Sequence, residues 1–187
     1  KNLDWPNKTI TMQKNWIGKS IGAEINFKVS ENDIILKVFT TRPDTIYGAT
    51  YMVIAPEYPM LFDITKSAYK EKMSKYCKLA SSKSELQRME LDKDKKGIFT
   101  GSYAVNPINN EKIPIWVSDY VMIGYGTGAI MAVPAHDKRD YKFAVKYDIS
   151  IRQVVSDSDN SKDLFEGEGV AVNSNMINGL STKDAKI

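Results

Sequence analysis

The sequence predicts a mainly β fold with added helices, which places the chain in the α+β class. Apolar and polar residues alternate strictly from Ile21 to Val29, as they do in a half-buried strand. A second strand-like segment, Ile34 to Phe39, follows a short polar turn. Between Ile64 and Leu91, apolar residues instead recur at spacings of three and four among lysines, which indicates amphipathic helix. We expect one domain.

The composition is that of an ordinary globular protein and excludes several function classes. The chain has 187 residues, 42% of them hydrophobic, and a net charge of +3, well short of the strongly basic signature of a dedicated nucleic-acid binder. With one cysteine, Cys77, no internal disulfide can form, and one histidine adds too few ligands for a structural zinc site. We find no leader peptide and no run of 18 apolar residues. We expect a cytoplasmic protein without metal or cofactor.

The first hairpin is predicted to lead directly into a stiff loop. Its second strand ends at the segment Thr40 to Thr45, in which Pro43 biases Arg42 away from the helical region. We therefore expect an extended loop here. Tyr47 to Ala55 is again strand-like and is stopped by Pro56.

The middle of the chain predicts a helix and its exit. Ser82 or Ser84 is a candidate cap for a second helix, and Asp92 to Lys96, followed by Gly97, is typical of a solvated helix exit. The apolar stripe of the first helix consists of Tyr69, Met73, Tyr76 and Ala80.

A second hairpin is predicted between Ser102 and Tyr120. Its strands, Ser102 to Pro107 and Ile113 to Tyr120, flank Asn109 and Asn110, a turn by composition. Pro114 favours an edge strand, because proline cannot donate to a sheet ladder.

The stretch Gly124 to Ile149 combines three local structures and is the best candidate for a functional site. Three glycines in five positions open it, and such a loop can present its backbone N–H groups to a ligand. Ala129 to Val133 then reads as a buried strand stopped by Pro134. Asp137 is a candidate N-cap, and Asp140 falls in the first turn of the following helix.

The two ends of the chain carry weaker signals. Lys1 to Lys19 is polar without a sustained period, and we expect its two tryptophans to anchor it. After the helix we predict a strand at Ile151 to Val155, a polar loop at Ser156 to Asp163, and irregular structure from Leu164 to Ile187.

Two long motifs, in the right order, resemble the post-transfer editing domain of bacterial-type leucyl-tRNA synthetases. They are TTRPDTIYGATYMVIAPEYP and GTGAIMAVPAHDKRDYKFAVKYD. The start of the chain, LDWPNKTITMQKNWIGKSIGAEI, and its end, VAVNSNMINGLS, are similar to the segments that join that domain to the synthetase body. On this resemblance, residues 1–187 form a single editing domain, with 1–20 and 165–187 as connectors. The departures are local: Asp148, Ser150 and Asn175 replace a usual glycine, proline and glycine.

The resemblance implies a small closed mixed β-barrel decorated by helices, as in the editing domains of the valyl, isoleucyl and leucyl enzymes. It also implies an aminoacyl-tRNA deacylase, in which a positioned water hydrolyses the ester of tRNA(Leu) mischarged with norvaline, isoleucine or a similar amino acid. The partners would be the tRNA 3′ end and the rest of the synthetase, with no membrane, and the isolated domain would be monomeric. Lys72 to Lys75 reads KMSK, like the nucleotide-activating loop of class I synthetases, but Met73 belongs to the helix stripe. ATP binding and aminoacylation would belong to the full-length enzyme only.

By the same resemblance, the catalytic residues are Thr40, Thr41 and Asp140. Asp140, held at a helix N-terminus, is expected to stay ionised and bind the α-ammonium of the misattached amino acid. The two threonine hydroxyls would hold a water or donate to the carbonyl oxygen. From the residues alone, a capping partner at N3 is the favoured interpretation of Asp140, and the alternative for the threonines is that they are strand-end residues chosen for β propensity.

The implied substrate-binding residues line the same pocket. Arg42 would contact the terminal nucleotide and Thr45 would form a wall against leucine, although Arg42 is by default a surface charge and Thr45 a turn residue. The remaining members are Tyr125 for the adenosine, Met131 and Val133 as walls, His136 to orient the helix start or a water, and Asp137 as the helix cap.

Two other function classes remain open at this point. One is a tRNA 3′-end binding module whose hydrolytic site is idle, for which a basic stripe with stacking aromatic residues would be expected. The other is a free-standing small-molecule hydrolase, which is disfavoured because both ends of the chain resemble connectors. A nucleophilic pair of Cys77 and His136 would need contact between separate elements, and we interpret these residues as unrelated.

Overall fold

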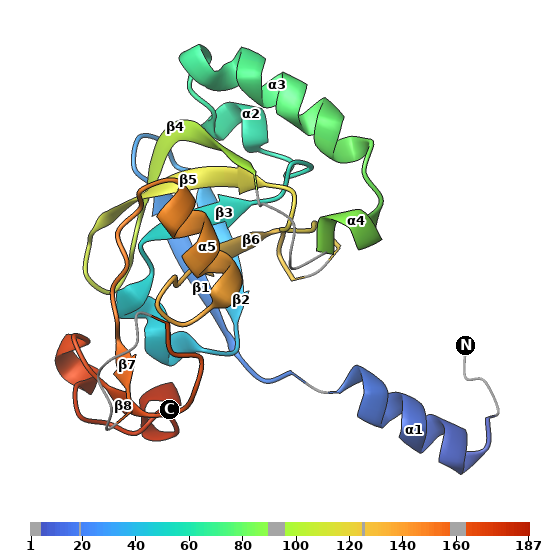
Figure 1. Ribbon diagram of the computed structural model, residues 1–187, viewed down its shortest axis with the longest axis vertical. Coiled ribbons are helices and arrows are strands. Elements are labelled where there is room, and N and C mark those ends of the chain that lie inside the picture. The colour runs from blue at the N-terminus through green and yellow to red at the C-terminus, as the bar shows by residue number, and fades with distance from the viewer. Residues whose placement is uncertain (1–4, 19, 90–95, 125, 158–163) are drawn as a thin grey trace.

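A computed structural model of the chain describes residues 5–18, 20–89, 96–124, 126–157 and 164–187. Figure 1 shows a strongly bent sheet with helix α5 (Lys138–Lys146) across its front, helices α2 (Leu61–Ile64) and α3 (Ser67–Ser81) above it, and helix α1 (Asn7–Ile17) apart from it. Within the described residues, none of the helices is long and apolar enough to cross a membrane.

Six strands form one mixed sheet, in which only the β3–β5 pair is parallel. The expected α+β class is therefore confirmed. The strands β2 and β6, at the two ends of the sheet order, approach each other with Cα atoms within 8 Å, but no ladder joins them in the described part of the chain. Closure into a barrel stays a prediction. In sheet order the strands are β2 (Ile35–Thr40), β1 (Ala23–Val29), β4 (Gly97–Val105), β5 (Lys112–Ser118), β3 (Tyr51–Ile54) and β6 (Ala129–Ala132).

The first hairpin forms as the alternation predicts. The strands β1 and β2 pair antiparallel, with Phe27 opposite Leu36, and both side chains are buried. Asn32 closes the turn by accepting a hydrogen bond from the Ile34 N–H at 3.0 Å. Because residues two apart share a face, this hairpin presents Val38 to the interior and ends at Thr40.

The segment after β2 differs from the expected extended loop and early strand. A 3-10 helix, η1 (Pro43–Gly48), begins directly at Pro43, and β3 starts only at Tyr51. The ring of Pro43 fixes a φ angle that suits the first helical position, which outweighed the apparent strand pattern. Arg42, with φ −124° and ψ 60°, lies outside the helical region, as a residue before proline should.

The second hairpin also forms, but β5 is not an edge strand. It lies between β4 and β3, so the expectation drawn from Pro114 is wrong. Pro114 faces Tyr103 near the start of β5, whereas the ladder to β3 begins one residue later at Ile115. The N–H that proline lacks is therefore not required for the ladder between β5 and β3, which begins after Pro114. Asn110, with φ 59°, adopts the left-handed conformation that the turn requires.

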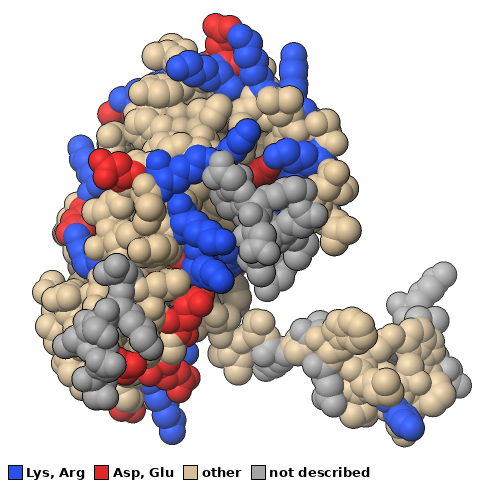
Figure 2. Space-filling view, viewed as in Figure 1, with Lys and Arg blue, Asp and Glu red and all other residues tan. Residues whose placement is uncertain are grey.

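The middle helices follow the predicted stripe. Met73 and Ala80 of α3 are buried, and α3 packs on β4. Ser84 caps α4, since its Oγ accepts from the Gln87 N–H at 3.3 Å while the Gln87 side chain accepts from the Ser84 N–H. The predicted helix exit, Asp92 to Lys96, lies outside the described residues except for Lys96. The helices are α2 (Leu61–Ile64), α3 (Ser67–Ser81), α4 (Glu85–Met89) and α5 (Lys138–Lys146), and lysines cover the outer faces of α3 and α5 (Figure 2).

The N-terminal segment is helical and stands apart from the other described residues. The helix α1 (Asn7–Ile17) stands clear of the sheet (Figure 1), and Trp16 is 91% exposed. The expected anchoring by two tryptophans is therefore wrong for this chain, because Trp5 is exposed as well. Gly18, with φ 64°, ends the helix by donating its N–H to the Lys14 carbonyl.

The C-terminal part is largely irregular, as expected, and the predicted strand is shifted. Only a two-residue strand β7 (Val155–Ser156) forms, and it pairs with β8 (Val170–Ala171). Two 3-10 helices follow, η2 (Asn175–Ile177) and η3 (Asp184–Lys186).

The core has two parts, separated by the sheet. The strand β3 is buried on both faces, with Met52 and Ile54 in one cluster. Tyr51 and Val53 belong to the second cluster, which lies beneath α5. In this second cluster Phe143 of α5 stacks on Tyr51, with ring centroids 5.4 Å apart. Helix α5 is therefore fixed on the strand next to β6.

Candidate functional site

A cavity of about 290 Å³ lies between the end of β2 with η1 on one side and the β6–α5 junction on the other. Its size is near the lower end for small-molecule sites. Nine of the ten residues predicted for the site line it, and the tenth, Tyr125, lies outside the described residues. The nine are Thr40, Thr41, Arg42, Thr45, Met131, Val133, His136, Asp137 and Asp140.

Sequence reasoning missed five further lining residues. Arg139 sits between the two selected aspartates, and Ile130 precedes the selected Met131. The position of Arg139 and Ile130 next to selected residues was the sequence signal that could have identified them. Val38 and Phe39 directly precede the threonines, and Ser20 carries no sequence signal for this position.

The hydroxyls of Thr40 and Thr45 in the first wall, residues 40–48, form their hydrogen bonds within that wall. The Thr40 Oγ1 accepts from the Arg42 N–H at 3.0 Å, and the Thr45 Oγ1 donates to the Arg42 carbonyl at 2.9 Å. Thr41 is exposed, and its hydroxyl forms no hydrogen bond within the described residues. The first wall therefore offers the Thr41 hydroxyl, and the hydrogen of the Thr40 hydroxyl, to a ligand.

Arg42 is oriented by Asp44. The Arg42 Nε lies 3.0 Å and the Nη2 2.9 Å from the carboxylate oxygens of Asp44, which is 1% exposed. The Arg42 Nη1 lies 3.5 Å from the Gly167 carbonyl. The guanidinium has five N–H donors, so donors remain for a ligand, but the group is not the free surface charge of the default interpretation.

Asp137 is the N-cap of α5, as predicted. Its Oδ1 accepts from the backbone N–H groups of Arg139 at 2.7 Å and Asp140 at 3.1 Å. Its Oδ2 pairs with the Arg139 guanidinium at 3.0 Å. Burial alone would raise the pKa of Asp137, but the bonds from Arg139 and the helix N–H groups hold that pKa below its usual value.

Asp140 does not cap the helix but joins it to the sheet and to the preceding loop. Its Oδ2 accepts from the Val133 N–H at 2.9 Å, and its Oδ1 accepts from the Tyr120 hydroxyl at 3.2 Å. The side chain is buried and lines the cavity. In addition, the buried Tyr51 hydroxyl donates to the Asp140 carbonyl at 3.1 Å.

The charge of Asp140 differs from the sequence expectation. Burial, followed by the nearby charge of Asp137, raises its pKa to about 7. The hydrogen bonds from Val133 and Tyr120 lower the pKa but do not outweigh burial. Near neutral pH Asp140 is therefore present both as the acid and as the carboxylate, rather than as a carboxylate that stays ionised.

His136 bridges three segments of backbone. Its Nε2 accepts from the N–H groups of Val154 and Val155, both at 3.0 Å, and its Nδ1 lies 2.7 Å from the Phe165 carbonyl. Because an N–H can only donate, Nε2 carries no proton, and the proton of the neutral ring is on Nδ1. Burial lowers the pKa of His136 and so favours this neutral form.

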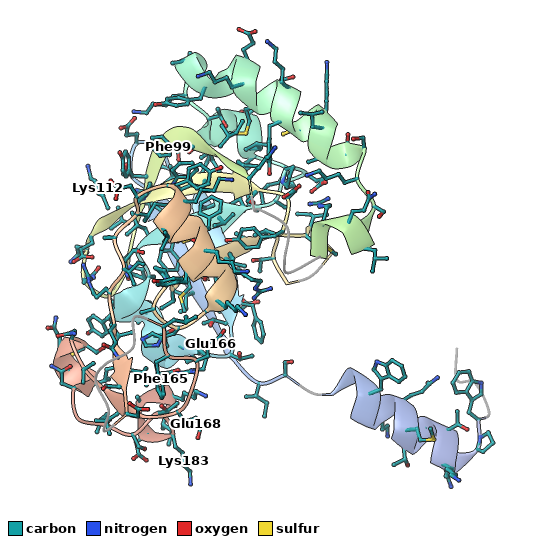
Figure 3. All side chains as sticks on the ribbon, in the orientation of Figure 1. Phe99, Lys112, Phe165, Glu166, Glu168 and Lys183 are labelled. Atoms are coloured by element: carbon teal, nitrogen blue, oxygen red, sulfur yellow. The ribbon has the colours of Figure 1, made fainter. Side chains whose placement is uncertain are left out.

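The segment after β7 thus borders the site. Phe165 and Glu166 lie beside the N-terminal end of α5 (Figure 3), where Glu166 accepts from the Lys138 N–H at 3.0 Å. Cys77, by contrast, lies on α3 and does not line the cavity, so it is not paired with His136. No group of three or more His, Cys, Asp or Glu side chains in the described residues is placed to hold a metal ion.

The arrangement can orient a small, positively charged group and a neighbouring carbonyl. Asp140 supplies a carboxylate, whose two hydrogen bonds leave lone pairs free. The hydroxyls of the opposite wall are donors of the kind that stabilise a developing oxyanion. Met131 and Val133, both largely buried, complete an apolar surface between the two groups.

Comparison with known proteins supports this description. The family model for the editing domain of leucyl-tRNA synthetase matches residues 14–187. The structure is similar to that of an Agrobacterium radiobacter K84 leucyl-tRNA synthetase, agnB2, solved as a ternary complex with tRNA and LeuAMS. The TM-score is 0.70 with 37% sequence identity, over 87% of this chain and 19% of that chain. The chain thus spans about a fifth of the length of that synthetase, and it belongs to the family of leucyl-tRNA synthetase editing domains.

Proposed function

We propose that the chain hydrolyses the ester that joins a non-cognate amino acid to the 3′ terminal adenosine of tRNA(Leu). The observation that carries this proposal is that Asp140 and the hydroxyl-bearing segment Thr40–Thr41 line the same cavity. The family, and the tRNA bound to the similar synthetase, support the same substrate.

Asp140 anchors the substrate through its α-ammonium group. An opposite charge within about 4–6 Å favours the ionised carboxylate, so the entering ammonium displaces the proton that burial retains at pH 7. The resulting pair is charge-assisted and enclosed. An ordinary ester lacks the ammonium and gains nothing from this carboxylate, which makes Asp140 a selector for aminoacyl esters.

The threonines position the water and the carbonyl. An aminoacyl ester is already reactive, so orientation of a water contributes more than a protein nucleophile would. The Thr41 hydroxyl donates to the carbonyl oxygen as negative charge develops there. The Thr40 hydroxyl, which accepts from the Arg42 N–H, has its single hydrogen left to hold the water.

Thr45 sets the amino-acid specificity. One methyl group in an apolar pocket is worth only about 1–3 kcal/mol, so attraction cannot separate norvaline or isoleucine from leucine strongly enough. A clash can. Thr45 is buried, and its hydroxyl is fixed on the Arg42 carbonyl, which holds its branched side chain in one position beside Met131 and Val133.

The remaining parts of the proposal concern architecture. Residues 1–187 form one editing domain whose β2 and β6 edges complete a small barrel, with 1–20 and 165–187 as connectors to a synthetase body. The exposed Trp16 on α1 is consistent with a segment that packs on protein outside this chain. Aminoacylation and ATP binding belong to that body.

A deacylation assay tests the function. The chain is incubated with tRNA(Leu) carrying norvaline, isoleucine or leucine, and release of the amino acid is followed. We expect release of norvaline and isoleucine and persistence of leucyl-tRNA. Binding of the tRNA without release of any amino acid would instead identify an idle 3′-end binding module, and equal release of all three would exclude an editing role.

A further inference from the structure

Tyr120 reaches the site from outside the cavity. It follows β5, and unlike Asp140 it does not line the cavity. Its hydroxyl donates to the Asp140 Oδ1 at 3.2 Å. Its ring packs edge to face on Phe143 of α5, with the ring centroids 6.1 Å apart. A residue that does not border the cavity is therefore bonded to the carboxylate for which we propose the ammonium-binding role.

The Asp140 carboxylate is fixed from two sides. The Val133 N–H, directly after β6, donates to Oδ2 at 2.9 Å, and Tyr120, after β5, donates to Oδ1. One bond alone would leave the carboxylate free to turn about its Cβ–Cγ bond, because that torsion is soft. Two bonds from separate elements define the plane of the carboxylate and the lone pairs that remain for a ligand.

The backbone around Tyr120 is held by the helices α3 and α4. The carbonyls of Asp119 and Val121 accept from the Arg88 guanidinium at 2.6 and 3.0 Å, and the Asp119 N–H donates to the Tyr76 hydroxyl at 2.9 Å. Both neighbours of Tyr120 are thus bonded to side chains of these helices. The position of the Tyr120 hydroxyl is therefore set by the fold and does not depend on a ligand.

Tyr120 is present as the neutral phenol. Burial, followed by the charge of Asp140, raises the pKa of Tyr120 well above its usual value, so the hydroxyl keeps its proton. A hydrogen bond donated to a carboxylate favours the ionised form of that carboxylate. At Asp140 this contribution opposes burial and the nearby charge of Asp137, which both favour the acid.

Of the described side chains, only Tyr120 donates a hydrogen bond to the Asp140 carboxylate. The charge of Arg139 also favours the ionised form, but its guanidinium is paired with Asp137 at 3.0 Å. The Tyr51 hydroxyl binds the backbone carbonyl of Asp140 instead of the carboxylate.

The other titratable groups that line the cavity have partners elsewhere. Arg42 is paired with Asp44 at 2.9 Å, and the neutral ring of His136 is bonded to backbone groups at both nitrogens. Orientation of the carboxylate by a side chain therefore depends on Tyr120.

Tyr147 provides a comparison within the same aromatic cluster. Its ring also packs on Phe143, with centroids 4.6 Å apart. Its hydroxyl, however, accepts from the Gly97 N–H at 2.9 Å and donates to the Gly97 carbonyl at 3.2 Å, both of them backbone groups of β4. The two tyrosines make similar ring contacts, but only the Tyr120 hydroxyl binds a side chain that lines the cavity.

We propose that Tyr120 is a positioning residue, whose hydroxyl orients the Asp140 carboxylate and favours its ionised form. The proposal rests on the proposed function in one respect, that the oriented carboxylate receives the α-ammonium of the substrate. Tyr120 acts through Asp140 and does not itself border the cavity.

A carbon-13 NMR titration of the side-chain carboxyl groups tests this contact without a substrate. The Asp140 signal is identified by its absence from the spectrum of Asp140→Asn, and in the unmodified chain it should titrate near its pKa of about 7. Tyr120→Phe keeps the ring and removes one hydrogen bond to a charged group, so the midpoint should move upward by about 1–2 pH units. Tyr147→Phe is the matched control and should leave the midpoint unchanged.

The pH dependence of norvalyl-tRNA(Leu) deacylation tests the consequence for the reaction. Relative to the unmodified chain, Tyr120→Phe should have a kcat/KM about 10- to 100-fold lower at pH 6 but within about 4-fold at pH 8.5, because the carboxylate regains its charge as the pH rises. Titration of the substrate's own α-amino group cancels in this ratio, and uncatalysed hydrolysis is subtracted.

The two measurements separate positioning from a loosened fold. An unchanged midpoint in Tyr120→Phe, or an equal upward move in Tyr147→Phe, would overturn the proposal. So would a loss of activity in Tyr120→Phe by one constant factor at every pH. If the unmodified chain releases no norvaline, the proposed function fails, while the NMR midpoint still decides whether Tyr120 controls the charge of Asp140.

Discussion

The two walls of the cavity are built in different ways. In the first, residues 40–48, the threonine hydroxyls and the Arg42–Asp44 ion pair join residues within three positions of each other. The long-range bonds of this wall run from Arg42 to the Gly167 carbonyl and from distant side chains to the carbonyls of Ile46 and Tyr47, and none involves a threonine hydroxyl. In the second, residues 133–140, the hydrogen bonds reach far along the chain. The Tyr51 hydroxyl binds the Asp140 carbonyl 89 residues away, and His136 accepts from Val154 18 residues away.

Because of this difference, a substitution in the two walls should affect stability to different extents. A side chain of the first wall can be changed while the surrounding sheet keeps its contacts. On the second wall, side chains that line the cavity also hold the fold together, because Asp140 and His136 satisfy buried backbone N–H groups. We therefore expect a change at the exposed Thr41 of the first wall to alter activity alone and changes in the second wall to alter activity and stability together.

The largest effect is expected at Asp140. Both Asp140→Ala and Asp140→Asn should abolish deacylation, because neither can pair with the ammonium. Alanine should in addition be less stable than asparagine by about 1–3 kcal/mol, since it leaves the buried Val133 N–H without an acceptor. Deacylation and urea unfolding of the two variants measure this. An Asn variant with full activity would remove Asp140 from the ammonium site.

Thr41→Ala tests the first wall. We expect kcat to fall by about 10²–10³, the loss typical of an oxyanion donor, with little change in substrate binding. The unfolding free energy should not change, because the exposed Thr41 hydroxyl has no partner in the described residues. Single-turnover rates and tRNA affinity decide between this role and simple binding, for which both parameters would fall together.

Thr45 permits a matched pair of variants, because its methyl group is proposed to form the pocket wall while its hydroxyl binds the Arg42 carbonyl. Thr45→Ser removes the methyl and keeps the bond to the Arg42 carbonyl, so leucyl-tRNA should become a substrate, with a gain of about 10- to 200-fold. Thr45→Val keeps the branched wall and loses about 0.5–1.5 kcal/mol of stability, with selectivity retained. Deacylation rates for norvalyl- and leucyl-tRNA test both, and the opposite pattern would make Thr45 a turn residue only.

The pH dependence of deacylation tests the charge of Asp140. Because its pKa is about 7, kcat/KM, which reports the free protein, should fall about tenfold per pH unit below that value. A profile that is flat from pH 5 to 8 would show that the carboxylate is already ionised before substrate binds, as the helix N-terminus alone would suggest.

The smallest effect is expected from His136. Its pKa in the fold is lower than its ordinary value of about 6.5, so the neutral ring stabilises the protein above that pH, and this stability is lost as the pH falls below it. The raised pKa of Asp140 acts in the opposite direction between about pH 4 and 7. Unfolding should therefore be measured in the Asp140→Asn background, where we expect stability to decrease from pH 6.5 to 5. Constant stability would contradict the neutral bridge.

The local features of this protein could be predicted from sequence. The alternation in β1 and β2, the stripe of α3 and the Asp137 cap each depend on residues a few positions apart. The two site motifs could be selected because each is continuous in the chain. Their meeting in one cavity was an expectation from the family resemblance.

The partners of the second wall could not be predicted, because they come from distant segments. Nothing near Asp140 indicates that Tyr120 and the Val133 N–H share its carboxylate, or that burial outweighs the helix N-terminus in setting its pKa. The predicted edge position of β5 was wrong for the same reason. Pro114 is acceptable inside the sheet only because the pairing with the parallel strand β3 begins at Ile115. Such outcomes depend on register between strands far apart in sequence.

The separation of the two walls along the chain also matters during synthesis. Met131 follows Thr41 by about 90 residues, so at 5–20 residues per second the second wall is made roughly 5–20 s after the first. During this time the nascent chain has a finished β1–β2 hairpin whose outer edge still lacks β6 beside it. Unpaired strand edges invite association with other chains. A ribosome that pauses between these two motifs would therefore expose this edge for longer, and the second wall could not be complete until His136 had met the segment at Val154.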